Sequence, residues 1–204
     1  MLFSTPWYGK SAPLFIIGLL FCGVMGGSAL ASNIQTEMDS KQVAPQAVSH
    51  PQLAGSRLQG EATLRFWGLR IYTARLWALP SFHANPTPTQ PVVLELEYLR
   101  DLKGSAIAER SLQEMKRAGT FTESQAQRWL ADMQRIFPDV KSGDRLSGLH
   151  QPGRAAVFWY NGRPAGQIDD AEFARLFFAI WLAPTTSEPD MRQALLGLNP
   201  THGR

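Results

Sequence analysis

Cysteine is almost absent from the 204-residue sequence, which contains a single one, Cys22. Phe21 precedes it, whereas a lipidation signal needs a small side chain there, so we do not expect a lipoprotein. Because Cys22 lies in an N-terminal stretch that we expect to be removed, the mature chain would carry no thiol for a disulfide, a metal or a nucleophile. Packing must then hold the fold.

Blocks of like charge are also missing. The chain has 20 Lys and Arg against 17 Asp and Glu, a formal net charge of +3, and its arginines are dispersed. Proteins that bind nucleic acids concentrate positive charge on one face or in one segment. We therefore expect no nucleic-acid partner.

Motifs of metal and hydrolase chemistry are absent as well. There is neither a His-Glu-x-x-His zinc motif nor a Gly-x-Ser-x-Gly nucleophile elbow. The four histidines are scattered over a leader, a loop, a turn and a tail: His50, His83, His150 and His202. The candidate acids lie beside turn glycines or at a helix start, which predicts capping of backbone N–H groups rather than acid–base catalysis: Asp139, Asp144, Asp169 and Asp170. We expect no metal and no cofactor.

One apolar run does occur, from Ala12 to Met25, and small residues including Ala29 and Ala31 follow it. The run is shorter than the ~20 residues that cross a bilayer, and small residues suit signal peptidase. We expect residues 1–31 to be a cleaved signal peptide that leaves Ser32 as the mature N-terminus. The protein would then be periplasmic, without stable insertion in the membrane.

The rest of the chain divides into a leader and one domain. Residues 32–53 are polar, contain Pro45 and Pro51 and show no periodicity, which is typical of a flexible segment. Residues 54–204 are of ordinary size for one domain and contain enough Trp, Phe and Leu for a substantial core.

An aromatic and arginine-rich run from Leu64 to Trp77 is the most informative segment. We interpret it as one strand broken at Gly68, where a bulge would decide which face each later side chain takes. Its arginines, Arg65, Arg70 and Arg75, would either stand in water on one face of the sheet or hold an anion.

Further elements follow from hydrophobic periodicity. Strands are predicted at residues 92–99, 145–149, 155–160 and 163–168, and helices at about 105–118, 122–137, 170–183 and 187–196. Strands and helices are segregated along the chain rather than strictly alternating. This order favours an α+β fold, with a large antiparallel sheet carrying helices on one face.

Three local motifs support these elements. Ser105 is the expected cap of the first helix, and Gly119 its left-handed C-terminal residue. Thr122-Glu123-Ser124-Gln125 has the sequence of a capping box. Asn161-Gly162 predicts a β-hairpin, because both residues adopt the positive φ of a type I′ turn.

Several segments resemble the chalcone isomerase-like family in its bacterial, exported form. The similarity lies in their order and spacing and covers nearly the whole mature domain: residues 64–77, Tyr98-Leu99-Arg100, 108–115, Phe137-Pro138-Asp139-Val140, Gly143-Asp144, 158–162, 173–182 and 192–197. The resemblance implies a large curved antiparallel sheet covered by a helical layer. In the plant members of the family an aromatic ligand binds between the two layers.

The resemblance also bears on activity. The plant enzymes add a phenolate oxygen to a conjugated ketone, which requires a cation for the phenolate and polar groups that polarise the ketone. When the chain is matched on the shared Phe66 and Tyr72, the polarising threonine falls at Trp67. When it is matched on the shared Arg100 and Gly104, the polarising tyrosine and asparagine fall at Ile107 and Glu114. The polarising set is therefore replaced.

A binding role fits this pattern better than catalysis. The arginine that holds the phenolate in the plant enzymes matches Arg57 of this chain. Non-catalytic relatives with the same fold use such an arginine to bind the carboxylate of a fatty acid. We therefore predict a non-catalytic binder of a small amphipathic or aromatic anion, fatty-acid-like or phenolic. The candidate ligand-binding residues are Arg57, Phe66, Trp67, Tyr72, Ile107 and Glu114.

Two other functions stay open. One is an isomerase, an intramolecular lyase with a rebuilt catalytic set. The other is an envelope protein-docking module that uses exposed aromatic side chains such as Trp77 and Trp159. A cavity between sheet and helices would favour the binder, and its lining would indicate the ligand.

Overall fold

The computed structural model describes residues 50–84 and 89–198. Its six strands form one antiparallel sheet in which every strand pairs with its neighbours in sequence. The strands are β1 (Arg57–Phe66), β2 (Leu69–Ala78), β3 (Val92–Tyr98), β4 (Arg145–Gln151), β5 (Ala155–Tyr160) and β6 (Arg163–Ile168). Short turns connect β1 to β2, β4 to β5 and β5 to β6, because hairpins link antiparallel neighbours directly, whereas a longer segment, residues 79–91, connects β2 to β3.

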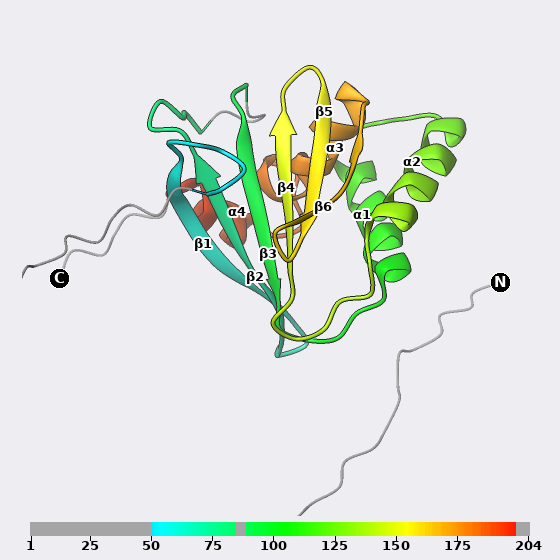
Figure 1. Ribbon diagram of the computed structural model, residues 1–204, viewed down its shortest axis with the longest axis horizontal. Helices are drawn as coiled ribbons and strands as arrows, with labels where there is room; N and C mark the ends of the chain where they lie inside the picture. Colours follow the sequence, from blue (N-terminus) through cyan, green and yellow to red (C-terminus); the bar gives the residue numbers. More distant parts are fainter. Residues whose placement is uncertain (1–49, 85–88, 199–204) are drawn as a thin grey trace, which may run out of the picture. The chain divides into compact units, whose positions relative to one another are not determined.

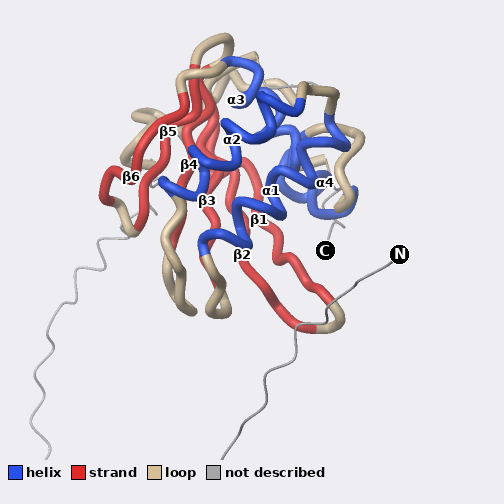
Figure 2. The backbone as a smooth tube through the Cα atoms, turned by 90° about the vertical axis from the view of Figure 1, so that its right-hand side faces the viewer, coloured by secondary structure: helices blue, strands red, loops and turns tan. Residues whose placement is uncertain are grey.

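Four helices cover one face of this sheet (Figures 1 and 2). They are α1 (Gly104–Ala118), α2 (Glu123–Ile136), α3 (Ala171–Leu182) and α4 (Pro189–Leu196). The first two form the connection between β3 and β4, and the last two follow the sheet. The predicted α+β class, with helices on one face of an antiparallel sheet, is confirmed.

Aromatic side chains dominate the core between the two layers. Phe177 of α3 lies at the centre, with its ring 5.3 Å from that of Phe158, 5.5 Å from Phe173 and 5.5 Å from Trp181. Trp129 of α2 is fully buried and donates a hydrogen bond from Nε1 to Asp170 at 2.9 Å. Packing of large rings therefore joins α2, α3 and the sheet.

The run from Leu64 to Trp77 is a hairpin rather than the single strand that we expected. Trp67 and Gly68 have φ values of 51° and 77°, and between β1 and β2 they form a two-residue turn. Two successive residues with positive φ are the signature of a type I′ turn. Since tryptophan is not a turn residue, the sequence pattern suggested a bulge at this point.

The helix caps are partly as expected. The capping box of Thr122 and Gln125 is present at the start of α2. The first helix is capped differently: its Gly104 N–H donates to Asp139 at 3.0 Å, and Ser105 does not act as the cap. Gly119 is extended rather than left-handed. A glycine suits this position because a Cβ there would lie 2.8 Å from the Leu176 side chain.

The described chain begins with a turn that packs on the face of the sheet opposite to the helices. His50, which we expected in a flexible leader, is buried; its ring lies 5.6 Å from that of Trp77, and its Nε2 lies 3.5 Å from Glu95. The remaining predicted leader and the predicted signal peptide, residues 1–49, lie outside the described residues. Trp77, which we considered for a docking surface, is only partly exposed, and His50 packs against its ring.

Candidate functional site

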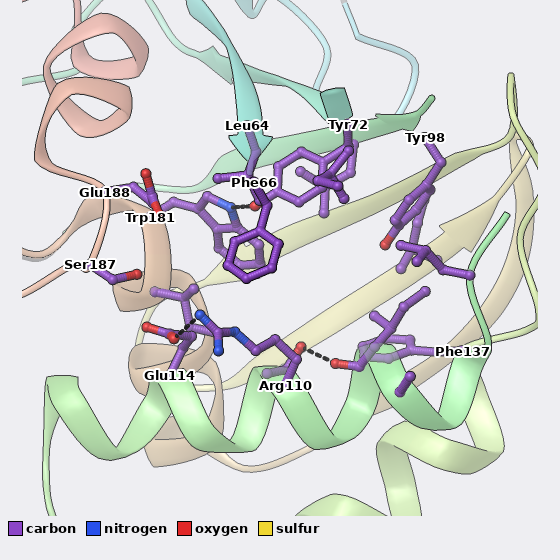
Figure 3. A pocket seen from close by; sticks show the side chains of 18 of the residues that line it. Leu64, Phe66, Tyr72, Tyr98, Arg110, Glu114, Phe137, Trp181, Ser187 and Glu188 are labelled. Carbon is purple, nitrogen blue, oxygen red and sulfur yellow. Dashed lines mark hydrogen bonds and ion pairs between the residues drawn. The ribbon is translucent and has the colours of Figure 1, made fainter. Parts of the chain in front are cut away.

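A pocket of about 330 Å³ lies between the sheet and the helical layer (Figure 3). Strands β1 to β4 form one wall, and α1, α3 and the segment before α4 form the other. Its volume is within the range of small-molecule sites, which begins at roughly 300 Å³. The lining residues are Leu64, Phe66, Ile71, Tyr72, Leu96, Tyr98, Leu102, Ala106, Ile107, Arg110, Ser111, Glu114, Phe137, Leu146, Phe177, Ile180, Trp181, Ser187 and Glu188.

The floor of the pocket is apolar and largely aromatic. Leu96, Phe137, Leu146 and Phe177 are buried, and they belong to the same cluster that forms the protein core. Since such walls offer no hydrogen bonds, the deep part of the pocket suits a hydrocarbon chain or an aromatic ring.

Two tyrosines supply the polar groups of the interior. The Tyr72 hydroxyl accepts a hydrogen bond from Trp181 Nε1 at 3.0 Å, and the ring of Tyr98 stands edge-on to that of Tyr72 at 6.1 Å. Burial raises the pKa of both phenols, which are therefore uncharged at neutral pH. Neither hydroxyl donates a hydrogen bond to another of the described residues, so both are able to donate to a ligand.

Charged side chains lie at the mouth. The Arg110 guanidinium is 2.7 Å from Glu114, and Glu114 also accepts from Arg117 at 3.1 Å. The Glu114 side chain is 8% exposed, whereas that of Arg110 is 62% exposed. Two arginines therefore share one buried carboxylate, and Arg110 is the single cation among the lining residues listed above. Glu188 lines the same mouth from the segment before α4.

Helix α1 presents its site residues by simple periodicity. Ile107, Arg110, Ser111 and Glu114 recur at intervals of three and four residues, which places them on one helical face. Gly104 sets the position of this face, because a Cβ there would lie 2.1 Å from the Phe137 carbonyl oxygen. The helix therefore starts in backbone contact with the segment that also contributes Phe137 to the pocket.

Four of the six predicted site residues line this pocket: Phe66, Tyr72, Ile107 and Glu114. They come from three elements, β1, β2 and α1. Figure 3 shows Phe66 and Tyr72 on the strand side of the pocket and Glu114 on the side of α1. Their part in binding stays a prediction.

Arg57 and Trp67 do not line the pocket. Arg57 pairs with Ala78 at the end of the β1–β2 hairpin far from the turn, whereas Leu64 and Tyr72, which do line the pocket, pair near the turn. Trp67 is 89% exposed at the turn itself. Arg57 was predicted from its match to the arginine of the family, and Trp67 from a single strand with a bulge at Gly68. In the structure Arg57 is the first residue of β1 and Trp67 follows the last, so the two lie at opposite ends of that strand.

The remaining arginines of this hairpin also stay outside the pocket. Arg75 lies on the opposite face of the sheet, where it forms ion pairs with Glu61, Glu95 and Glu97. Arg65 and Arg70 are exposed beside the turn. The cation of the site is instead Arg110, which we did not predict.

A helical pattern could have indicated Arg110. Once Ile107 and Glu114 are assigned to a ligand-facing surface, the residues three and four positions after Ile107, Arg110 and Ser111, must share it. Tyr98 carried no comparable signal, since its alternation with charged residues predicts only an inward-facing side chain.

Three of the four acids that we expected in turns and caps, Asp139, Asp144 and Asp170, accept backbone N–H groups, whereas, among the described residues, Asp169 accepts only from the Gln167 side chain. Asp170 accepts from the N–H groups of Glu172 and Phe173, and Asp144 accepts from the Lys141 N–H, Asn161 and Tyr160. Within residues 50–84 and 89–198, no group of three or more His, Cys, Asp or Glu side chains is arranged to hold a metal. Among the same residues, no helix is both long and apolar enough to span a bilayer.

Comparisons with known proteins agree with the architecture. A family model described as chalcone isomerase-like matches residues 45–197. An uncharacterized protein of Haemophilus influenzae is 28% identical over 132 residues, which are 64% of this chain and 63% of that protein. The alignment thus spans under two thirds of the length of that relative.

A solved structure shows the same fold. The crystal structure of a fatty-acid binding protein of Arabidopsis thaliana aligns with a TM-score of 0.56 and 13% sequence identity. The alignment covers 73% of this chain and 95% of the plant protein. At this identity the likeness concerns the arrangement of strands and helices.

Proposed function

Because the chain belongs to the chalcone isomerase-like family, we propose that its pocket binds a small amphipathic anion without transforming it. One observation carries the proposal: an apolar, aromatic pocket of about 330 Å³ has a single lining cation, Arg110, at its mouth. A hydrocarbon tail would occupy the floor, and a carboxylate or phenolate would reach the guanidinium.

The pairing of Arg110 supports an exchange mechanism. Glu114 holds Arg110 at 2.7 Å and Arg117 at 3.1 Å, so one carboxylate faces two cations. An incoming anion would take over part of the interaction with Arg110 while Arg117 continues to neutralise Glu114. Glu114 would therefore stay paired inside the wall.

The fatty-acid binding protein of Arabidopsis thaliana supports a long-chain carboxylate as the ligand, since it has the same fold. The predicted signal peptide supports the periplasm as the location. A periplasmic binder of this kind would hold a free fatty acid or a related amphipathic acid in the aqueous space.

The test is direct binding. The purified protein, stripped of lipid, is titrated with a fluorescent fatty acid and then with unlabelled fatty acids and neutral alcohols of matched chain length. We expect saturable binding at one site, with the acid displacing the probe better than the alcohol. Equal displacement by acid and alcohol would contradict an anion site, and absence of saturable binding would contradict a ligand pocket.

The isomerase alternative is carried by a different observation. Tyr72 and Tyr98 place two uncharged phenolic hydroxyls in the pocket, and such groups are able to polarise a carbonyl. Because Ile107 and Glu114 replace two polarising residues of the plant enzymes, the arrangement favours binding over ring closure.

A further inference from the structure

The tip of the β1–β2 hairpin is an exposed apolar surface beside the mouth of the pocket. Residues 65 to 70 are all exposed, and three of them are large and apolar: Phe66 at 62%, Trp67 at 89% and Leu69 at 51%. Figure 2 shows the hairpin reaching beyond the helical layer. The register explains the protrusion, because Tyr72 and Tyr98 form the last pair between β2 and β3.

The turn itself is made from an unfavourable residue. Trp67 has a φ of 51°, and positive φ is disfavoured for a bulky side chain. The β5–β6 hairpin provides the comparison within the same chain: Asn161 and Gly162 have φ values of 48° and 78°, against 51° and 77° for Trp67 and Gly68. Where turn geometry alone decides, this chain uses asparagine, which tolerates the conformation.

A second unfavourable feature lies directly beside the turn. Arg65 and Arg70 are partners across the two strands, and like charges in opposed positions destabilise a sheet. Within residues 50–84 and 89–198, neither arginine forms an ion pair with a carboxylate. Two positive charges thus flank an exposed Phe-Trp-Gly-Leu tip.

We propose that this tip docks on the surface of a lipid bilayer that contains anionic lipids. Phe66, Trp67 and Leu69 would enter the boundary between headgroups and acyl chains, where amphipathic aromatic rings are favoured. Arg65 and Arg70 would contact the lipid phosphates, which relieves their mutual repulsion. Both local features that oppose folding become favourable on such a surface.

The tip is continuous with the pocket. Phe66 belongs to the exposed tip and also lines the mouth, and its ring centroid lies 6.1 Å from that of Trp67. Docking would therefore bring the mouth to the bilayer surface. If the proposed function holds, the ligand would enter from the membrane, but the docking itself rests on the tip alone.

Vesicle binding by the full-length protein tests the proposal. Sedimentation is measured with vesicles of phosphatidylethanolamine and phosphatidylglycerol at 7:3, and with vesicles of phosphatidylcholine alone. Trp67→Asn should lower binding severalfold while its thermal midpoint equals or exceeds that of wild type, because asparagine suits the turn. Arg65→Gln/Arg70→Gln should lower binding to the anionic vesicles by about fivefold per arginine and remove the preference for them.

Leu58→Asn is the matched control, since Leu58 is 46% exposed on the same strand but far from the turn, and it should bind as wild type. Fatty-acid binding without vesicles should be unchanged in Trp67→Asn, which separates this proposal from the proposed function. Equal vesicle binding by wild type and Trp67→Asn would overturn docking by the tip. Docking on a membrane would also be overturned if the wild-type protein bound neither kind of vesicle but formed a dimer, and if Trp67→Asn did not form that dimer.

Discussion

Arg110 and Glu114 form an ion pair of 2.7 Å at the mouth of the pocket, between a guanidinium that is largely exposed and a carboxylate that is almost fully buried. They lie one helical turn apart on α1, so the helix alone fixes their separation. Arg110 is a cation that both water and a ligand can reach. Glu114 is a carboxylate that weakens the attraction of Arg110 for other anions. Substitutions of the two residues should therefore change anion binding in opposite directions.

Arg110→Gln should weaken binding of a fatty acid by about three- to tenfold, because an exposed charged hydrogen bond contributes about 1 kcal/mol. The measurement is displacement of a fluorescent fatty acid at neutral pH. Arg163→Gln is the control, since Arg163 is an exposed arginine on β6 that does not line the pocket. Equal affinities of Arg110→Gln and Arg163→Gln would show that Arg110 does not hold the anion.

Glu114→Gln should tighten binding of the same fatty acid by a few-fold. The amide keeps the size of the side chain but removes the negative charge that competes for Arg110. Binding of a neutral alcohol of the same chain length should change little, which separates the charge effect from a change of pocket shape. Tighter binding of the alcohol as well as the acid would assign the effect to shape.

The sequence allowed prediction of the fold because its signals were local and redundant. Alternation in residues 92–99 predicted β3, and the Asn161-Gly162 pair predicted the β5–β6 hairpin with its positive φ values. The capping box at Thr122 located the start of α2. Each of these patterns states a backbone requirement that few residue types satisfy.

The first hairpin was not predicted because its turn lacks the usual sequence signal. Trp67 occupies a position where the geometry of a two-residue turn favours asparagine, so the sequence did not indicate a turn there. With the turn missed, the run was interpreted as one strand and Trp67 was assigned to a ligand-facing surface, whereas Arg57 was assigned from its match to the arginine of the family. The pairing of Arg57 with Ala78 depends on that turn, and no spacing within β1 reveals it.

His150 should make the folded protein sensitive to mild acid. Burial lowers the pKa of its imidazole to about 4, and its Nδ1 has no hydrogen-bond partner within residues 50–84 and 89–198. Between pH 6.5 and 4 the unfolded chain takes up a proton that folded His150 does not. The free energy of unfolding should therefore fall by up to about 3 kcal/mol as the pH drops through this range.

Urea denaturation at several pH values measures this effect. His150→Leu should lose most of the pH dependence between 6.5 and 4, since a buried leucine binds no proton. His83→Leu should retain it, because His83 is exposed. Retention of the full dependence in His150→Leu would assign it to other groups.

Asp170 should stabilise the start of α3 in a pH-dependent way. Burial opposes its ionisation, but hydrogen bonds from Phe173, Trp129 and Glu172 outweigh burial and lower the pKa of the carboxyl. A lowered pKa means that this stabilisation is complete at neutral pH and is lost as the pH falls below the usual aspartate range. Asp170→Ala should lower the free energy of unfolding at pH 7 by about 1 kcal/mol through loss of the cap.

Asp170→Asn separates the cap from the charge. Asparagine is also a good N-cap, so this variant should keep most of the stability at pH 7 and lose the decline in acid. Thermal midpoints at pH 7 and in acid provide the comparison. If Asp170→Ala were as stable as wild type at pH 7, the cap would contribute nothing to α3.

Finally, the purified protein should not cyclise a chalcone above the uncatalysed rate. The resemblance to the plant enzymes implies that Ile107 and Glu114, which line the pocket, stand in place of a hydroxyl and an amide, and loss of one such donor lowers a rate by about 10²-fold or more. An absorbance assay of the open-chain substrate measures the reaction. Turnover that disappears in Tyr98→Phe or Tyr72→Phe would establish a rebuilt catalytic set based on the two pocket phenols. Binding of the chalcone without turnover would agree with the proposed binder, because the aromatic floor accepts the rings while the ketone lacks the usual polarising groups.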